Sequence, residues 1–150
     1  MDLLDYIPEG NKRRSDFISA ALDIINALAR FQDEESGLWY QVVDKGDVAG
    51  NWLETSCSCL YTYAIAKAVK KGLLHRTYCK SIKRAYEGII KVIRFEGPDL
   101  IVPEICIGTG VGDFRFYLDR PRAQNDLHGM GAFLLMCTEY HDMKIRLLSP

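Results

Sequence analysis

Side chains that can bind a sugar gather around one predicted helix start, between residues 39 and 55. An aromatic ring can stack on a pyranose ring, because the contact buries apolar area on both partners. Amide, hydroxyl and carboxylate groups beside it can hydrogen-bond the sugar hydroxyls. This combination predicts a carbohydrate-binding site, and its candidate residues are Trp39, Tyr40, Asn51, Trp52, Glu54 and Thr55.

Ordinary structural roles explain the same residue types. We expect at least one of Trp39 and Tyr40 to fill space between helices rather than contact a ligand. Asn51 is a candidate helix N-cap, and Glu54 in the first turn would complement the helix dipole. Capping alone accounts for both residue types, while their occurrence together with Trp52 adds support to a ligand role.

A second polar group, formed by Asn125, Asp126 and His128, stands directly before another predicted helix. Asp126 is a candidate N-cap, and Gly129 and Gly131 lower the helix propensity that follows. Such glycines suggest the close approach of a neighbouring segment or a ligand. His128 could hydrogen-bond a sugar hydroxyl or carboxylate, and a structural role explains it equally well. No second metal-binding side chain stands at helical spacing, so we expect no metal site.

Four helices must position these groups, and their hydrophobic patterns differ. Apolar residues at three- and four-residue steps predict a helix capped by Ser15 and running to about Phe31, with a broad buried face. The segment 53–68 is small or apolar on nearly every side, which predicts a helix buried all round. A helix over about 77–93 has one apolar stripe and one basic side, whereas 129–141 is again small and apolar.

Between the third and fourth helices we expect an extended excursion. Residues 101–107 and 114–118 predict either the two strands of a β-hairpin, turned by the glycines of 108–112, or a long ordered loop. We also expect 38–43 to be extended. The alternation of outer and buried helices predicts an all-α fold of helical hairpins, arranged as in toroids with inner and outer helix rings.

The composition fits one soluble domain. The chain has 150 residues, of which 48% are hydrophobic and 26% charged, enough for a core and unlike a disordered chain. A net charge of −1 offers no basic surface, so we expect neither nucleic acid nor a membrane as partner. The five cysteines are odd in number and lack CxxC spacing, which favours buried thiols in a reducing compartment. We therefore expect a cytoplasmic protein without cofactors.

Three co-linear segments resemble one enzyme family: GLWYQVVDKG at 37–46, GNWLETSCSCLYTYAIAKAVKKG at 50–72 and QNDLHGMGAFLLM at 124–136. Together they are similar to the C-terminal part of the unsaturated rhamnogalacturonyl hydrolases, glycoside hydrolase family 105. That family is related to the unsaturated glucuronyl hydrolases of family 88. The resemblance covers essentially the whole chain and implies an incomplete (α/α)6 barrel, with residues 1–150 as the C-terminal part of a single domain.

The resemblance also implies a reaction. Members of the family act on pectin-derived oligosaccharides that carry a 4,5-unsaturated uronic acid at the non-reducing end. An aspartic acid protonates the double bond and helps water add across it, which is general acid/base catalysis. The hydrated sugar then opens and the glycosidic link is released. The family's catalytic aspartate and its tryptophan–arginine–tryptophan cluster have no counterpart here, and Asp5 and Asp44 have no motif support, so we assign no catalytic residue.

We therefore expect a glycoside hydrolase fragment without activity of its own. Its substrate, in the full-length parent, would be an unsaturated uronyl oligosaccharide bound partly by this chain. The alternative is a non-catalytic helical module that binds a carbohydrate or a protein. A cut ring would leave apolar helix faces bare, which predicts self-association or pairing with a missing N-terminal half.

Overall fold

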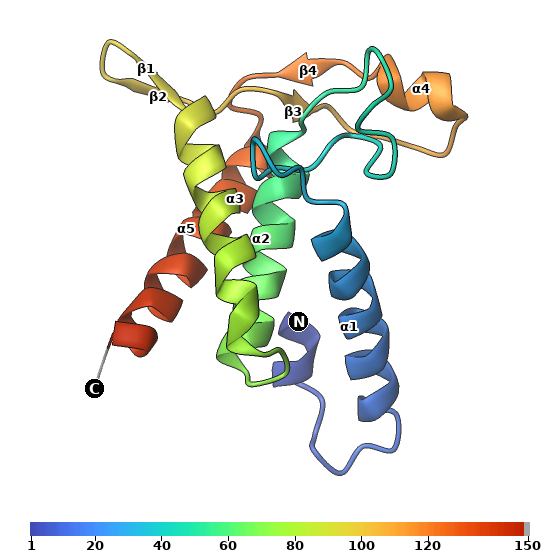
Figure 1. Ribbon diagram of the computed structural model, residues 1–150, viewed down its shortest axis with the longest axis vertical. Helices are drawn as coiled ribbons and strands as arrows, with labels where there is room; N and C mark the ends of the chain where they lie inside the picture. The colour runs from blue at the N-terminus through green and yellow to red at the C-terminus, as the bar shows by residue number, and fades with distance from the viewer. Residues whose placement is uncertain (149–150) are drawn as a thin grey trace.

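Four long helices form the body of the protein, and the computed structural model describes residues 1–148, with side chains through residue 144. They are α1 (Arg14–Arg30), α2 (Thr55–Lys70), α3 (Cys79–Val92) and α5 (Leu127–Leu148). The long connections, the strands and the short α4 (Phe114–Leu118) gather at one end of these helices (Figure 1). The predicted all-α architecture is confirmed.

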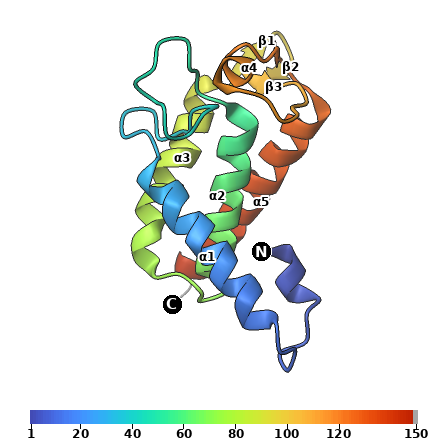
Figure 2. The ribbon, with the colours of Figure 1, turned by 90° about the vertical axis from the view of Figure 1, so that its right-hand side faces the viewer.

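Helix α2 lies at the centre, between α3 and α5, with α1 on a third side (Figure 2). Its small residues make this position possible, because they let neighbouring helices approach closely. The hydroxyls buried with them are satisfied within the helix: Ser58 Oγ donates to the Glu54 carbonyl (2.6 Å) and Thr62 Oγ1 to the Ser58 carbonyl (2.7 Å). The prediction of a helix buried on nearly every side is therefore confirmed for α2.

The apolar core divides into two clusters that meet at α2. One lies between α1, α2 and α3 and contains Ile25, Leu28, Trp39, Ile65, Ala66, Ala68, Val69, Ile82, Ala85 and Met143. The other lies between α2, α3, α5 and the connection before α5, and contains Leu38, Cys59, Ile89, Val102, Ile105, Ala132, Phe133 and Met136. The outer helix α3 buries one stripe and leaves its charged side in water, as its sequence predicts.

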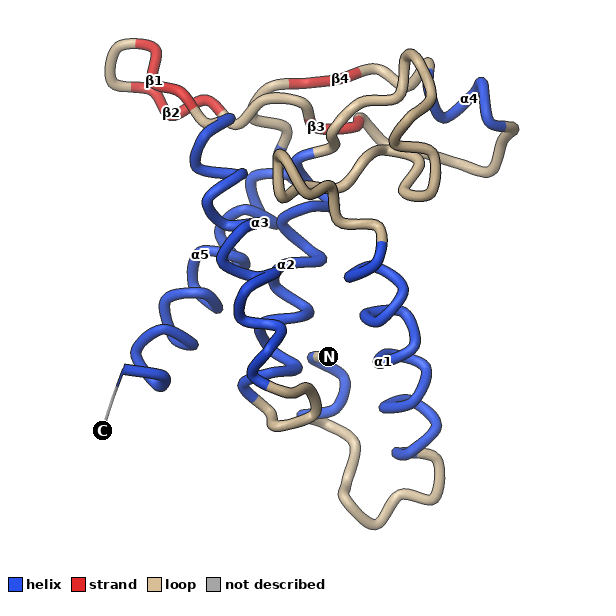
Figure 3. Tube along the Cα trace, viewed as in Figure 1, coloured by secondary structure: helices blue, strands red, loops and turns tan. Residues whose placement is uncertain are grey.

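The predicted β-hairpin over 101–118 is wrong in its pairing (Figure 3). The hairpin in the structure comes earlier and joins β1 (Arg94–Glu96) to β2 (Asp99–Ile101). Strand β3 (Ile105–Cys106) pairs instead with β4 (Arg122–Ala123). The segment expected as the return strand is helix α4, because Asp113 Oδ1 accepts the Phe116 N–H at 2.8 Å and caps a helical turn. Within 38–43, strand pairing is limited to one bridge between Tyr40 and Leu53.

Helix α1 departs from its prediction at both its cap and its buried face. It begins at Arg14, and the N-cap position belongs to Arg13 rather than Ser15, without a side-chain hydrogen bond. The expected broad apolar face is only partly covered, because Phe17 is 42% exposed and Ile24 is 62% exposed. Within α1, Ile25 and Leu28 belong to the core.

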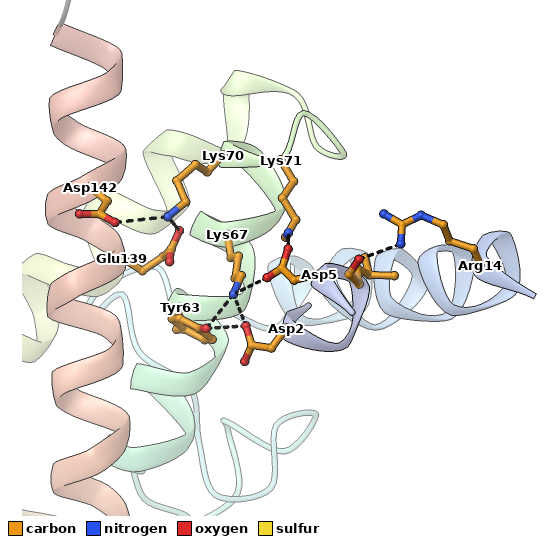
Figure 4. Close-up of polar contacts among 10 residues, drawn as sticks. Asp2, Asp5, Arg14, Tyr63, Lys67, Lys70, Lys71, Glu139 and Asp142 are labelled. Atoms are coloured by element: carbon orange, nitrogen blue, oxygen red, sulfur yellow. Dashed lines mark hydrogen bonds and ion pairs between the residues drawn. The ribbon is translucent and has the colours of Figure 1, made fainter. Parts of the chain in front are cut away.

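Two short 3-10 helices, η1 (Asp2–Asp5) and η2 (Arg76–Tyr78), complete the fold. Ion pairs fasten η1 to the last turns of α2 (Figure 4). Lys67 pairs with Asp2 and, at 3.3 Å, with Asp5, while Lys71 also pairs with Asp5. The N-terminal segment is thus a docked part of the fold.

Candidate functional site

A cleft of about 430 Å³ opens where α2 and α5 begin, between β3, the loop after it and α4. Most of its lining can form hydrogen bonds, and two of its members are thiols. It is lined by Gln41, Glu54, Ser56, Cys57, Tyr61, Cys106, Gly108, Thr109, Tyr117 and His128. The first turn of α2 supplies its floor, and the start of α5 supplies His128.

Glu54 is the N-cap of α2 and is 1% exposed. Its Oε1 accepts from the Ser56 N–H (3.1 Å), the Ser56 hydroxyl (2.7 Å) and the Cys106 N–H (2.9 Å), and its Oε2 accepts from the Cys57 N–H. These four donors match the hydrogen-bonding capacity of a carboxylate. Glu54 therefore joins the start of α2 to β3 and has little capacity left for a ligand or a proton transfer.

The Cys57 thiol and the Tyr61 hydroxyl are neutral groups at physiological pH, because the pKa of each is raised. Burial, together with the nearby Glu54 carboxylate, raises the pKa of Cys57 well above its ordinary value. Burial also raises the pKa of the Tyr61 hydroxyl. Cys106 Sγ accepts a hydrogen bond from the Gln41 amide at 3.3 Å. A thiol that stays protonated is a poor nucleophile, so Cys57 shapes the cleft rather than attacking a substrate.

His128 is the cleft residue whose ring is oriented by a carboxylate. Its Nδ1 lies 2.5 Å from Asp126 Oδ1, and its backbone N–H donates to the same oxygen at 3.2 Å. Asp126 thus caps the start of α5, as its sequence position predicts, and fixes the imidazole as well. The Nε2 atom of His128 keeps its capacity to donate to or accept from a ligand.

Three of the aromatic and hydroxyl residues predicted for the site are part of the interior. Trp39 has no exposed surface, and its indole N–H donates to the Leu28 carbonyl at 2.7 Å. Trp52 is 6% exposed and lies against the Arg122 guanidinium, 4.5 Å from its ring centroid. Thr55 is 1% exposed. These three side chains are therefore buried in the protein interior and do not line the cleft.

The two predicted asparagines hold loops together. Asn51 Nδ2 donates to the carbonyls of Val42 (2.9 Å) and Lys45 (2.8 Å), so it closes the loop before α2 rather than capping the helix. Asn125 has a φ of 54° and bonds the backbone of both Leu100 and Val102. Tyr40 lies apart from the cleft, in a second hollow of about 420 Å³ lined also by Asp33, Asp44 and Asp47.

Of the nine predicted residues, Glu54 and His128 line the cleft, and Asp126 orients His128. Sequence reasoning missed most of the lining. Ser56 and Cys57 could have been found, because the first turn of a buried helix that begins at a polar loop must face that loop. Gln41, Thr109 and Tyr117 reach the cleft from loops and from α4, whose folding leaves no local pattern in the sequence.

Two structural features are absent from the described part of the chain. Residues 1–144 contain no group of three histidine, cysteine or acidic side chains placed to hold a metal ion. None of the helices described is long and apolar enough to cross a membrane.

Comparisons with known proteins give one consistent family. The family model of Glycosyl Hydrolase Family 88 matches residues 1–144. A family 105 glycoside hydrolase of C. acetobutylicum superposes with a TM-score of 0.87 and 33% identity, over 94% of this chain and 42% of that one. A possible family 105 member from Salmonella enterica superposes with a TM-score of 0.83 and 33% identity, over 97% of this chain and 36% of that one.

A curated relative gives the same picture of partial coverage. A protein of the picA locus of Rhizobium radiobacter is 28% identical over 120 residues, which make up 70% of this chain and 52% of that protein. The chain thus spans about half the length of the curated relative and less than half of the solved structures.

Proposed function

The chain belongs to glycosyl hydrolase family 88, and we propose that its cleft forms one wall of the saccharide site of such an enzyme. The observation that carries this proposal is the lining itself. Gln41, Ser56, Thr109 and Tyr117 present amide and hydroxyl groups in one cleft, and His128 adds an oriented imidazole. Neutral donors and acceptors of this kind suit sugar hydroxyls and a uronate carboxylate.

The substrate class follows from the resemblance of the sequence to family 105. We propose oligosaccharides from pectin, of the rhamnogalacturonan type, that end in a 4,5-unsaturated uronic acid, removed by hydration of the double bond. In this proposal His128 Nε2 hydrogen-bonds the sugar, with Asp126 as its positioning residue, and Ser56 and Gln41 contact hydroxyl groups.

The acid that would protonate the double bond is not assigned to this chain. Glu54 is the one carboxylate among the cleft-lining residues described, and its oxygens already accept four hydrogen bonds. Asp126 is turned to His128. We therefore propose that this chain binds part of the saccharide while a segment of the family's barrel outside these residues supplies the acid.

The test uses the purified chain and an unsaturated uronyl disaccharide. We expect calorimetry to detect binding and the double-bond absorbance to stay constant, because no free acid faces the cleft. His128→Ala should weaken binding at least about threefold, a fraction of the roughly 1.5 kcal/mol that one hydrogen bond contributes. His141→Ala, an exposed histidine beyond the cleft, is the matched control. Robust turnover would overturn the assignment of the acid to another segment.

A non-catalytic carbohydrate-binding module is the second candidate, favoured by the absence of a free acid among the described cleft residues. Parallel titrations with saturated and unsaturated uronides separate the two functions. Equal affinity for both sugars would support the module, whereas preference for the double bond would support the hydrolase wall.

We also propose that further helical hairpins cover the apolar side of α2 and α5. A hollow of about 520 Å³ lies there between Tyr63, Gly131, Leu134, Leu135, Thr138 and Glu139. Leu134 is 60% exposed and Leu135 is 46% exposed on the described chain, which is unusual for neighbouring leucines on one helix. In a ring of hairpins these side chains would face the next inner helices.

A further inference from the structure

We propose that a groove between α1 and α3 binds oxyanions, in particular the carboxylates of an acidic oligosaccharide. The groove has a volume of about 410 Å³ and shares no residue with the cleft. It is lined by Asn26, Ala29, Arg30, Thr77, Tyr78, Lys80, Ser81 and Arg84. Three cations and several hydroxyls therefore meet in one concavity on the outer helices.

The lining of this groove contains no carboxylate. The cleft contains Glu54 and the hollow on α5 contains Glu139. The hollow beside Tyr40 contains three aspartates and shares Arg30 with the groove, whereas Lys80 and Arg84 line the groove and not that hollow. In a protein of net charge −1, three cations gathered without an acid form a local region of positive potential. Such a region attracts an anionic group.

The three cations are also free of ion pairs. Many basic side chains of this protein, such as Lys67, Lys70 and Lys71, lie within 4.0 Å of a carboxylate. Among the residues described, no carboxylate lies that close to Arg30, Lys80 or Arg84, and the ion pairs that do form involve other basic side chains.

Two of the acids that lie near the groove along the chain, Glu87 and Asp33, are engaged. Glu87, the one carboxylate on α3, pairs with Lys83 at 2.6 Å. Asp33, just after α1, accepts the Ser36 N–H at 2.7 Å and the Ser36 hydroxyl at 2.6 Å. The groove cations thus keep their charge available for a ligand.

The floor of the groove is preorganised. The buried Gln32 accepts from the Arg84 guanidinium at 2.9 Å and from the Ser81 hydroxyl at 2.6 Å, and its own amide donates to the Gly37 and Ser81 carbonyls. Only one Arg84 N–H is used in this way, so most of its five donors can point to a ligand. Tyr78 is tied to Asn26 at 2.5 Å. An oxyanion would therefore meet an Arg84 guanidinium that is already held in place, with free N–H donors.

The cations come from two helices, which suits an extended ligand with more than one charge. A short run of uronic acids carries one carboxylate per sugar and can contact Arg30 on α1 and Lys80 on α3 together. The choice of a uronate rests on the proposed function, whereas the oxyanion site does not. Inorganic phosphate offers the same chemistry from another source.

The experiment measures binding of saturated trigalacturonate and, separately, of inorganic phosphate to the whole chain by calorimetry at low salt. The groove variant is Arg30→Gln with Lys80→Gln, since neither side chain has a hydrogen-bonding or ion-pair partner within the described protein. The matched control is Lys12→Gln with Lys91→Gln, which removes the same charge from exposed positions outside the groove. Unfolding curves confirm that both variants keep the fold.

We expect the groove variant to bind trigalacturonate at least about tenfold more weakly, the factor that one charged hydrogen bond supplies. The control should change affinity less than about twofold. If the unmodified chain binds phosphate but not trigalacturonate, and the groove variant loses the phosphate binding, the oxyanion site stands and the choice of a uronate ligand is wrong. Failure of both ligands, or equal loss in the control, would overturn the site. If only His128→Ala weakens trigalacturonate, the sugar binds in the cleft, so failure of the groove leaves the proposed function standing.

Discussion

At the scale of single residues, the site is organised by Glu54. The sequence predicts Glu54 as a sugar ligand or as a first-turn acid that complements the helix dipole, with Asn51 as the candidate cap. The structure makes Glu54 the cap and adds a bond to the Cys106 N–H. The sequence does not show that bond, because Cys106 approaches through the path of the chain between α3 and α4. Burial of the carboxylate follows from that approach.

Replacing Glu54 by glutamine tests this role. A glutamine side chain has one acceptor oxygen, and its NH₂ group would face backbone N–H donors, so at least one buried donor would lose its partner. We expect Glu54→Gln to lower the free energy of unfolding by about 2 kcal/mol, within the range for an unsatisfied buried group. Urea denaturation measures the change. Ser56→Ala, which removes only one of the four donors, should cost about half as much, and equal costs would contradict the account.

At the scale of elements, the sequence predicts the helices well and the connections poorly. Apolar stripes at helical spacing identify α1 and α3, and long runs of small and apolar residues identify α2 and α5, because both patterns are local in the sequence. The pairing of Ile105 with Ala123 is set by how the chain returns across the ends of the helices, and α4 begins at a cap that a strand-like alternation obscures. The cleft is formed from these connections, which explains why most of its lining was missed.

The contact between α3 and the turn before Trp39 depends on one small residue. A Cβ atom at Gly88 would overlap the Ser36 carbonyl oxygen and lie 2.9 Å from Leu38 Cδ2. We expect Gly88→Ala to destabilise the fold by about 1–3 kcal/mol, because the backbone cannot yield without moving the helix. Gly131→Ala is the control, since a Cβ there meets nothing within 4 Å, and alanine should stabilise α5 by up to about 1 kcal/mol. Thermal unfolding of both variants provides the comparison.

The docking of η1 on α2 should depend on pH. Hydrogen bonds from Lys71 and Lys67 hold the pKa of Asp5 below its ordinary value of 3.8. For Asp2, burial raises the pKa, but contacts with Lys67 and Tyr63 outweigh it and leave the pKa lowered. A lowered folded-state pKa means that the stabilisation is complete above the ordinary value and is lost as the pH falls through the folded value.

We therefore expect the N-terminal segment to detach as the pH falls below about 3.8, before or together with global unfolding. The methyl resonances of the buried Leu4 report this step in NMR spectra. Asp5→Asn should loosen the segment already at neutral pH, whereas Asp16→Asn, an exposed acid on α1, should leave Leu4 unchanged. If the Leu4 resonances change neither at low pH nor in the Asp5→Asn variant, apolar packing alone holds the segment.

At the scale of the whole molecule, the described chain is built like part of a larger assembly of helices. The two clusters bury most of α2 and one side of α5, while Leu60, Leu134 and Leu135 keep 44%, 60% and 46% of their surface exposed. The resemblance of the sequence to a ring of hairpins predicts exposed apolar helix faces, but it does not predict which leucines are exposed. Partial coverage of the longer relatives agrees with a surface that other hairpins complete.

These leucines should make the purified chain self-associate. Burying a leucine side chain yields about 1.5–3 kcal/mol, so Leu134 and Leu135 beside one hollow favour contact with a second copy when nothing else covers them. We expect light scattering to detect dimers or larger species in the micromolar range, and Leu134→Gln to shift the population toward monomer. Leu127→Gln, at an 88% exposed position at the start of α5, should have no such effect, because Leu127 lies outside the hollow. A monomer throughout this range would mean that the face is stable in water and needs no partner.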